Sequence, residues 1–346
     1  MSFEPPCCPR NDCPSRCGKP FEYRLRGRYK RRLDGQIVQR FRCLACHISF
    51  SRQNFRLDYR LKRPELLPLF FTDRISKVTH RQSARNHACS RSTEERHFRR
   101  LSLHCGEFHD ARMAEVAAAQ GLGEVFLLDE LETYEHHRTQ KPLTVPILIE
   151  RSSGFVLDVR VGTLAARVAP GKAKKRRLEG KSAADGEAGD EAKFERKSES
   201  RQVVKQAFER LRAFAPKEGA LRVLTDQKHS YAQLLQEIFD KRCQHERTSS
   251  TRRRDVRNPL WPINHTLARV RDNVSRLVRE TWAAAKKRCF LAGQLAIWVC
   301  YRNYVRGRTN RKPDTTPAMA LGVQMQQWEL ARLLEWRVMP VPAAAA

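Results

Sequence analysis

VFLLDELETYEHH, residues 125–137, sets an uninterrupted apolar run directly ahead of a group of acids. The run extends from Val125 to Leu128, and a stretch of this composition is typical of a strand buried on both faces. The acids that follow it are Asp129, Glu130, Glu132 and Glu135. Such a strand end predicts either the start of a solvated loop or a site where carboxylates bind a cation.

A second stretch, LRVLTDQKHSY at residues 221–231, repeats the pattern with Asp226 after the apolar run. If the two strands are neighbours in one sheet, their ends bring the carboxylates of Asp129 and Asp226 together. Like charges a few Å apart repel unless a cation neutralises them, and carboxylate oxygens suit Mg²⁺ or Mn²⁺. We therefore expect both residues to be catalytic and to bind two such ions, which activate a nucleophile and stabilise the leaving oxygen of a phosphodiester. Glu130 and Glu132 then either tune this site or cap the segment that follows.

The charge of the chain indicates a polyanionic partner. Its 346 residues include 67 Lys and Arg against 38 Asp and Glu, a formal charge of +29. Nucleic acid is the simplest such partner, held through its phosphates. An anionic membrane is the alternative, but no apolar stretch of membrane-spanning length and no signal peptide occur. We expect no membrane association and a cytoplasmic, nucleoid-associated protein.

The cysteines indicate a metal site near the N-terminus. Six of the eleven lie in the first fifty residues: Cys7, Cys8, Cys13, Cys17, Cys43 and Cys46. Without a secretory signal, clustered cysteines favour metal binding over disulfides. We expect structural Zn²⁺ on Cys8, Cys13, Cys43 and Cys46, as in a zinc ribbon, with Cys7 or Cys17 as alternatives in the first turn. The stretch between the two cysteine turns predicts a β-hairpin that reverses at Asp34-Gly35.

Residues 76–103 fit the spacing of a helix–turn–helix, with Ser90 or Ser92 capping the second helix. That helix would present a row of arginines to DNA. The row consists of Arg91, Arg96, Arg99 and Arg100. The alternative is a basic helical hairpin that only packs between domains.

The coarse pattern predicts a multidomain α/β protein. We expect a zinc ribbon over 1–60, a helix–turn–helix segment over 61–110, a catalytic domain over 111–325 and a tail over 326–346. Within the catalytic domain, a short helix at 111–120 and three strands precede a polar insertion at about 170–200, which we expect to be disordered. A helix, the second acidic strand and another helix follow. An arginine-rich loop then leads to a long helical stretch from about 263 to 305.

These segments together resemble insertion-sequence transposases of the DDE type that carry an N-terminal zinc ribbon and helix–turn–helix. The matching motifs are CPRNDC…FRCLACHISFS, RQSAR…RRL, LLDELET, LTDQKHSY, NPLWPINHTLARVRDNVSRLVRETWAAAKK and YRNYVR…TTPAMALG. The resemblance implies an RNase H-like catalytic domain, a mixed sheet with flanking helices. It also implies an acid at the end of the first strand and another after the fourth, the places of Asp129 and Asp226.

The chain departs from this family at the third metal-binding residue, which is usually a Glu on a later helix. That position falls on Asn264, with His265 beside it. Asp272, Glu280 and Glu246 are the acidic alternatives. Asp272 lies about 10–12 Å along a helix from His265, so the two cannot serve one ion. We expect Asn264 or His265 near the metal, and Arg269 and Arg276 on DNA phosphates close by.

The resemblance implies a transposase that cuts at the terminal inverted repeats of an element and joins the freed 3′-hydroxyls to target DNA. Two ends must meet in one complex, so at least a homodimer is expected. Three alternatives stay open at this point. They are a non-enzymatic DNA-binding regulator, a catalytically decayed transposase, and an RNase H-like nuclease that cleaves without joining.

Overall fold

The computed structural model describes residues 3–10, 12–16, 20–32, 35–118, 123–167, 197–215, 220–249, 251–278 and 283–336. The insertion expected at about 170–200 lies almost wholly outside these ranges, as do Cys17, Asp34 and Glu280. The chain divides into two compact units. Residues 1–68 and 329–346 form the first unit, and residues 69–328 form the second.

The first unit is built on a three-stranded antiparallel sheet in the order β1-β2-β3. Its elements are β1 (Tyr23–Lys30), β2 (Ile37–Cys43), β3 (Ser49–Ser51), the short 3₁₀ turns η1 (Pro14–Arg16) and η2 (Arg52–Phe55), and helix α11 (Leu330–Glu335). Phe41, Phe50 and Phe55 form its small core together with buried cysteines. So little apolar surface stabilises a fold weakly, and a unit of this size usually depends on a further cross-link.

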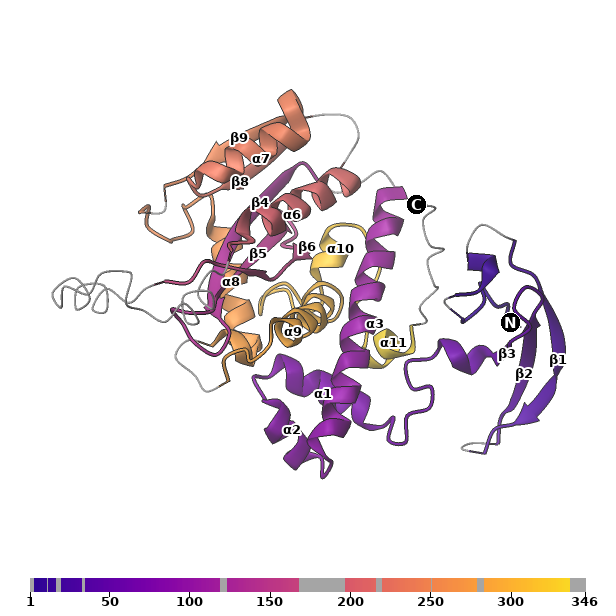
Figure 1. The fold of residues 1–346 in the computed structure, drawn as a ribbon. Helices are drawn as coiled ribbons and strands as arrows, with labels where there is room; N and C mark the ends of the chain where they lie inside the picture. Colours follow the sequence, from indigo (N-terminus) through magenta and orange to yellow (C-terminus); the bar gives the residue numbers. More distant parts are fainter. Residues whose placement is uncertain are drawn as a thin grey trace, which may run out of the picture. The chain divides into compact units, whose positions relative to one another are not determined.

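The second unit is built on a mixed sheet whose main path runs β6-β5-β4-β8-β9, with β7 paired to β5 (Figure 1). The strands are β4 (Val125–Tyr134), β5 (Pro142–Glu150), β6 (Val156–Val159), β7 (Gly162–Thr163), β8 (Leu221–Thr225) and β9 (Cys243–Arg247). β4, β5 and β6 are antiparallel neighbours, whereas β8 and β9 run parallel to β4. β4 is therefore the central strand, as its apolar run predicts.

Helices cover both faces of this sheet (Figure 1). They are α6 (Ser200–Phe214), α7 (His229–Phe239), α8 (Trp261–Asn273) and α9 (Arg288–Cys300), with α10 (Pro317–Ala320) and the turn η3 (Asp240–Arg242) at the margins. Leu127 and Leu131 of β4 share a core with residues of α8 and α9. Side chains alternate along a strand, so Asp129 belongs to the same face as Leu127 and Leu131, and Glu130 belongs to the opposite face.

The segment before the sheet is helical, but its boundaries differ from the expected ones. Helices α1 (Leu66–Ile75) and α2 (His80–Asn86) precede α3, which runs unbroken from Arg91 to Ala118. The prediction of a separate helix at 111–120 is wrong. Residues 111–118 are the last part of α3, which crosses the predicted domain boundary at residue 110. Ser90 caps α3, since its hydroxyl accepts the N–H of Thr93 at 3.1 Å. α3 packs along α9, and Phe98, Leu101 and Phe108 are among its buried residues.

The long helix expected over 263–305 is also wrong. α8 ends at Asn273, a 3₁₀ turn η4 covers Ser275–Leu277, and α9 begins at Arg288 and passes into the π-helical turn η5 (Tyr301–Val305). Asn273 accounts for the first break. Its amide donates to the carbonyl of Ile75 at 3.3 Å and accepts from the Trp298 indole at 3.2 Å, which draws the chain out of helical conformation.

β9 lies where the sequence predicted a polar loop. It is an edge strand of polar residues, CQHER, and therefore carries no apolar signature. Within the described ranges, no helix has the length and apolar character needed to cross a bilayer.

Candidate metal centres

Asp129 lies in the middle of β4, which runs on to Tyr134, so the strand end expected at this acid is wrong. Asp226 directly follows the last residue of β8, the parallel neighbour of β4. β4 and β8 pair with Leu127 opposite Leu224, and both leucines belong to one core. Asp129 and Asp226 each follow their leucine by two residues. Strand alternation places Asp129 on the α8 face with Leu127, and Asp226 lies near enough for its charge to act on Asp129. Both side chains are partly exposed, so a solvent-borne cation can reach them.

The pKa of Asp129 reflects its burial and the charge of Asp226. Burial raises the pKa of Asp129 to about 6, and the charge of Asp226 acts in the same direction. The N–H of Glu130, which donates to Asp129 Oδ1 at 2.7 Å, and the charge of Arg254 oppose the rise. A carboxylate held beside another one, at the edge of an apolar core, gains from a bound cation.

Three of the five candidates for the third position have other partners or lie outside the described residues. Asp272 forms an ion pair with Lys77 at 2.7 Å, and its side chain is 74% exposed. Glu246 on β9 pairs with Arg222. Glu280 is outside the described ranges. Where the chain is described, no third His, Cys, Asp or Glu lies within 4.8 Å of the aspartate pair in a metal-binding group.

Asn264 and His265 both lie in the first turns of α8, which packs on β4 and β5. The His265 ring stacks on Trp261 with centroids 5.7 Å apart. Burial lowers the pKa of His265, and the charges of Arg269 and Arg302 add to the effect. A histidine close to two aspartates would be shifted upward. The amide of Asn264 is half-buried, as the His265 ring is, and Asn264 is the donor that we carry into the proposal.

Glu130 has a role that the sequence did not reveal. On the face opposite Asp129, its carboxylate accepts hydrogen bonds from four side chains. These are Thr144 (2.5 Å), Tyr231 (2.6 Å), Ser200 (2.8 Å) and Lys228. Burial alone would raise the pKa of Glu130, but these donors and the Lys228 charge lower it. The strand alternation of VFLLDELET was the available signal, because it separates Asp129 from Glu130.

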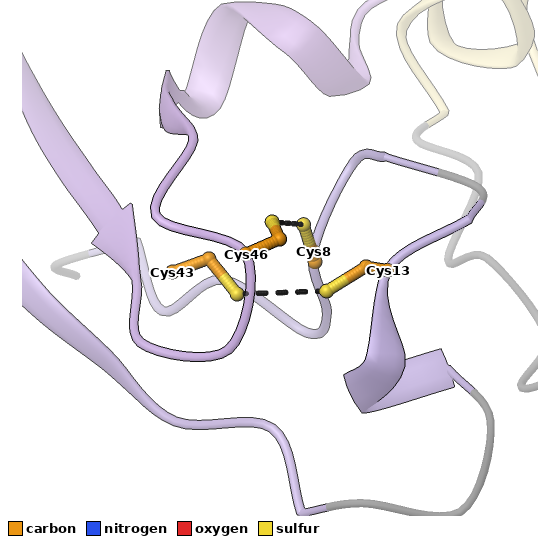
Figure 2. A group of neighbouring side chains, drawn as sticks. All are labelled: Cys8, Cys13, Cys43 and Cys46. Atoms are coloured by element: carbon orange, nitrogen blue, oxygen red, sulfur yellow. Dashed lines mark hydrogen bonds between the residues drawn. The ribbon is translucent and has the colours of Figure 1, made fainter.

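The four cysteines selected from the sequence converge in the first unit (Figure 2). Their sulfurs all lie within 4.8 Å of one another, with Cys8 and Cys46 at 3.5 Å and Cys13 and Cys43 at 3.7 Å. Four sulfurs arranged tetrahedrally about 2.3 Å from zinc are about 3.8 Å apart, so the set fits that ion.

The turn geometry and the thiol chemistry agree with this fit. The N–H of His47 donates to the carbonyl of Cys43 at 3.0 Å, which closes the second cysteine turn. Burial raises the pKa of Cys8 and Cys46, whereas at Cys13 burial is outweighed by hydrogen bonds from Ser15 and the neighbouring thiols, which lower its pKa to about 7. A thiolate is the form that binds metal. Cys7 is outside the group, since its thiol donates to the Cys8 carbonyl at 3.3 Å.

The arginines expected to contact DNA fall into two sets. On α3, Arg91, Arg96 and Arg99 are exposed and Arg100 is half-buried; Arg91 pairs with Glu95 at 2.7 Å. These side chains are accessible to a phosphate backbone.

Arg269 and Arg276 are instead engaged within the protein. Arg269 donates to the carbonyl of Arg308 at 2.6 Å. The Arg276 guanidinium lies 5.9 Å from the centroid of the Phe98 ring and 5.8 Å from that of the Phe290 ring. It also donates a short hydrogen bond, 2.5 Å, to Gln294 Oε1. Its burial lowers its pKa to about 10. Arg276 therefore contacts two aromatic rings and one amide within the protein.

Comparison with known proteins adds little to this geometry. No family model and no curated protein matches the chain. Among solved structures, the one titled "Crystal structure of a pre-cleavage Mos1 transpososome" aligns over 70% of this chain and 78% of its own, with 11% identity and a TM-score of 0.20. A likeness at that level does not establish a shared fold.

The cysteine group predicts one zinc ion per chain. Cys46→Ser removes a ligand and should reduce the zinc content, measured by mass spectrometry of the purified protein, to a small fraction of the wild-type value. Cys7→Ser is the matched control and should keep one zinc, because Cys7 lies outside the group. Full zinc in Cys46→Ser would contradict the assignment.

The pKa of Asp129 predicts a stability effect. The folded-state value of about 6 lies above the ordinary 3.8. The contribution of this group to stability is therefore complete below pH 3.8 and is lost as the pH rises through 6. Without divalent metal at pH 7.5, Asp129→Asn should raise the free energy of unfolding by about 1–3 kcal/mol in chemical denaturation.

The exposed Asp314 gives the control, because Asp314→Asn should change stability by less than about 0.5 kcal/mol. Mn²⁺ should stabilise the wild type but not Asp129→Asn. A less stable Asp129→Asn protein would indicate a structural role for this carboxylate.

Proposed function

We propose that this protein is a DDE-type DNA transposase with an RNase H-like catalytic domain in its second unit. It cleaves DNA at the ends of its element and joins the 3′-hydroxyls to target DNA. The observation that carries the proposal is the position of two acids on adjacent parallel strands. Asp129 lies within β4, Asp226 directly follows the last residue of β8, and the charge of Asp226 acts on the Asp129 carboxylate.

The strand order supports the fold assignment. Along the main path, β4 is the first strand of the sheet in the chain and β8 the fourth. Asp226 directly follows the fourth strand, which agrees with the resemblance to DDE transposases, and Asp129 lies within the first strand and not at its end. Asn264, on a helix packed against the same face, would complete the set with an amide oxygen.

The chemistry assigned to these residues is electrostatic and geometric. Bound Mg²⁺ or Mn²⁺ ions supply an activated water or 3′-hydroxyl and a charge for the leaving oxygen. Asp129 and Asp226 hold the ions and set their separation, and they must be ionised to do so. The raised pKa of Asp129 implies that metal binding weakens as the pH falls below about 6.

The remaining surface supports a DNA partner. β1 carries Arg24, Arg26, Arg28 and Lys30, and seven of its eight residues are exposed. We assign the first unit as a zinc ribbon that contacts the phosphate backbone, and α2 with the start of α3 as a helix–turn–helix. Each neutralised phosphate releases counterions, so binding should weaken steeply with salt. Joining two ends calls for at least a homodimer on DNA.

The proposal predicts cleavage and strand transfer with Mg²⁺ on DNA that carries the ends of the element. Asp129→Asn and Asp226→Asn should each lower both rates at least about 100-fold, since the ions contribute several kcal/mol to the transition state. Asn264→Ala should lower them about tenfold or more. The matched control is Asp272→Asn, on the same helix, which should change the rates less than about threefold because its ion pair is exposed.

Each rival function has its own outcome in this assay. Cleavage without joined products would indicate a nuclease, and DNA binding without cleavage would indicate a regulator or a decayed enzyme. Full activity in Asp129→Asn would refute the proposed site.

A further inference from the structure

Glu130 and Lys228 link the two faces of the sheet behind the aspartate pair. Glu130 follows Asp129 in β4, so the two side chains point to opposite faces. The Glu130 carboxylate is 9% exposed and accepts from four donors on β5, α6, α7 and the loop after β8. Two carboxylate oxygens offer about four lone pairs. Glu130 thus has no free site for a metal ion, and its role differs from that of Asp129.

Lys228 joins this network to the other aspartate. Its ammonium binds Glu130 and donates to Ser200 Oγ at 2.8 Å. Its backbone N–H donates to Asp226 Oδ1 at 3.0 Å. Asp226 has left the strand ladder, and its own carbonyl accepts from Thr225 Oγ1 at 2.7 Å. The side chain of Lys228 thereby anchors the loop residue that orients the Asp226 carboxylate.

Glu130 and Lys228 each act on the position of one of the two aspartates. Glu130 fixes β4 at the residue next to Asp129, and Lys228 fixes the loop two residues beyond Asp226. Because Glu130 and Lys228 bind each other, they set the separation of the two aspartates. A fixed separation matters most for Mg²⁺, which demands near-ideal octahedral geometry, whereas Ca²⁺ accepts flexible and irregular sites.

We propose that Glu130 and Lys228 are positioning residues that hold Asp129 and Asp226 at the spacing required by a small divalent cation and so give the site its preference for Mg²⁺ or Mn²⁺ over Ca²⁺. This inference rests on the proposed function, because it assumes that the two aspartates bind metal. In this proposal Glu130 and Lys228 act through the two aspartates and are not themselves metal ligands.

The test is direct metal binding to the full-length protein without DNA. Mn²⁺ binding is followed by the electron paramagnetic resonance signal of the free ion, and Mg²⁺ and Ca²⁺ are measured by competition. Glu130→Gln and Lys228→Met should each weaken Mn²⁺ binding about 10- to 100-fold. Binding of Ca²⁺ should change less, so the ratio of Mg²⁺ to Ca²⁺ affinity should fall. Lys228→Arg, which keeps the charge and the reach, should recover part of the loss.

The chain offers a matched control pair. Lys205 and Glu237 form an exposed ion pair between α6 and α7, away from the aspartates. Lys205→Met and Glu237→Gln should change Mn²⁺ binding by less than about twofold, as expected for a surface pair. The double variant Glu130→Gln/Lys228→Met leaves no unpaired charge in the network. It is measured wherever a single variant melts at a lower temperature than the wild type.

The outcomes separate this inference from the proposed function. If Asp129→Asn and Asp226→Asn abolish Mn²⁺ binding while folded Glu130 and Lys228 variants bind with wild-type affinity and selectivity, the positioning role is overturned and the metal site stands. If the aspartate variants bind Mn²⁺ as the wild type does, the metal site itself is refuted.

Discussion

The parallel pairing of β4 with β8 is the constraint on which the rest of the second unit depends. It sets Leu127 beside Leu224 in the core, and Asp129 and Asp226 each follow their leucine by two residues. A slip of one residue in this register would turn one carboxylate to the opposite side of the sheet. The apolar residues before each aspartate prevent that slip, because they would lose their burial against α8 and α9.

This arrangement places like charges together and therefore opposes stability. Burial, and after it the charge of Asp226, raises the pKa of Asp129 to about 6, so ionising Asp129 in the folded protein costs free energy. On the opposite face of the sheet, a hydrogen-bonded network holds the residues next to the aspartates in place. There Glu130 is saturated with donors and paired with Lys228, and the same lysine donates its N–H to Asp226. Functional sites commonly have this character, with strain at the reacting groups and well-satisfied contacts behind them.

The parts of the structure that sequence predicts are those encoded by local pattern. Two apolar runs that each end in Asp identify the acid pair, and the spacing of Cys8, Cys13, Cys43 and Cys46 identifies a group whose sulfurs converge. Contacts between distant residues are not encoded this way. Glu130 looks like a solvated neighbour of Asp129 until Ser200, Lys228 and Tyr231, 70 to 101 residues later, close around it.

The same limit explains the errors in the predicted helices, and it shows why the partners of single arginines could not be predicted. The apolar period of the 263–305 stretch continues across the break at Asn273, whose amide binds Ile75 and the Trp298 indole. Arg276 has the sequence signature of a DNA contact, and in the structure its guanidinium lies beside the stacked rings of Phe98 and Phe290, which belong to two other helices. Charge predicts a basic surface as a whole, but tertiary packing decides which arginines belong to it.

The most direct test of the central claim is the location of bound metal. Crystals of the protein soaked in Mn²⁺ would be measured for anomalous scattering. We predict an anomalous-scattering peak between the carboxylates of Asp129 and Asp226, about 2.0–2.6 Å from an oxygen of each. Crystals of Asp129→Asn should show no such peak. A wild-type crystal with manganese bound elsewhere and no density between the two aspartates would contradict it.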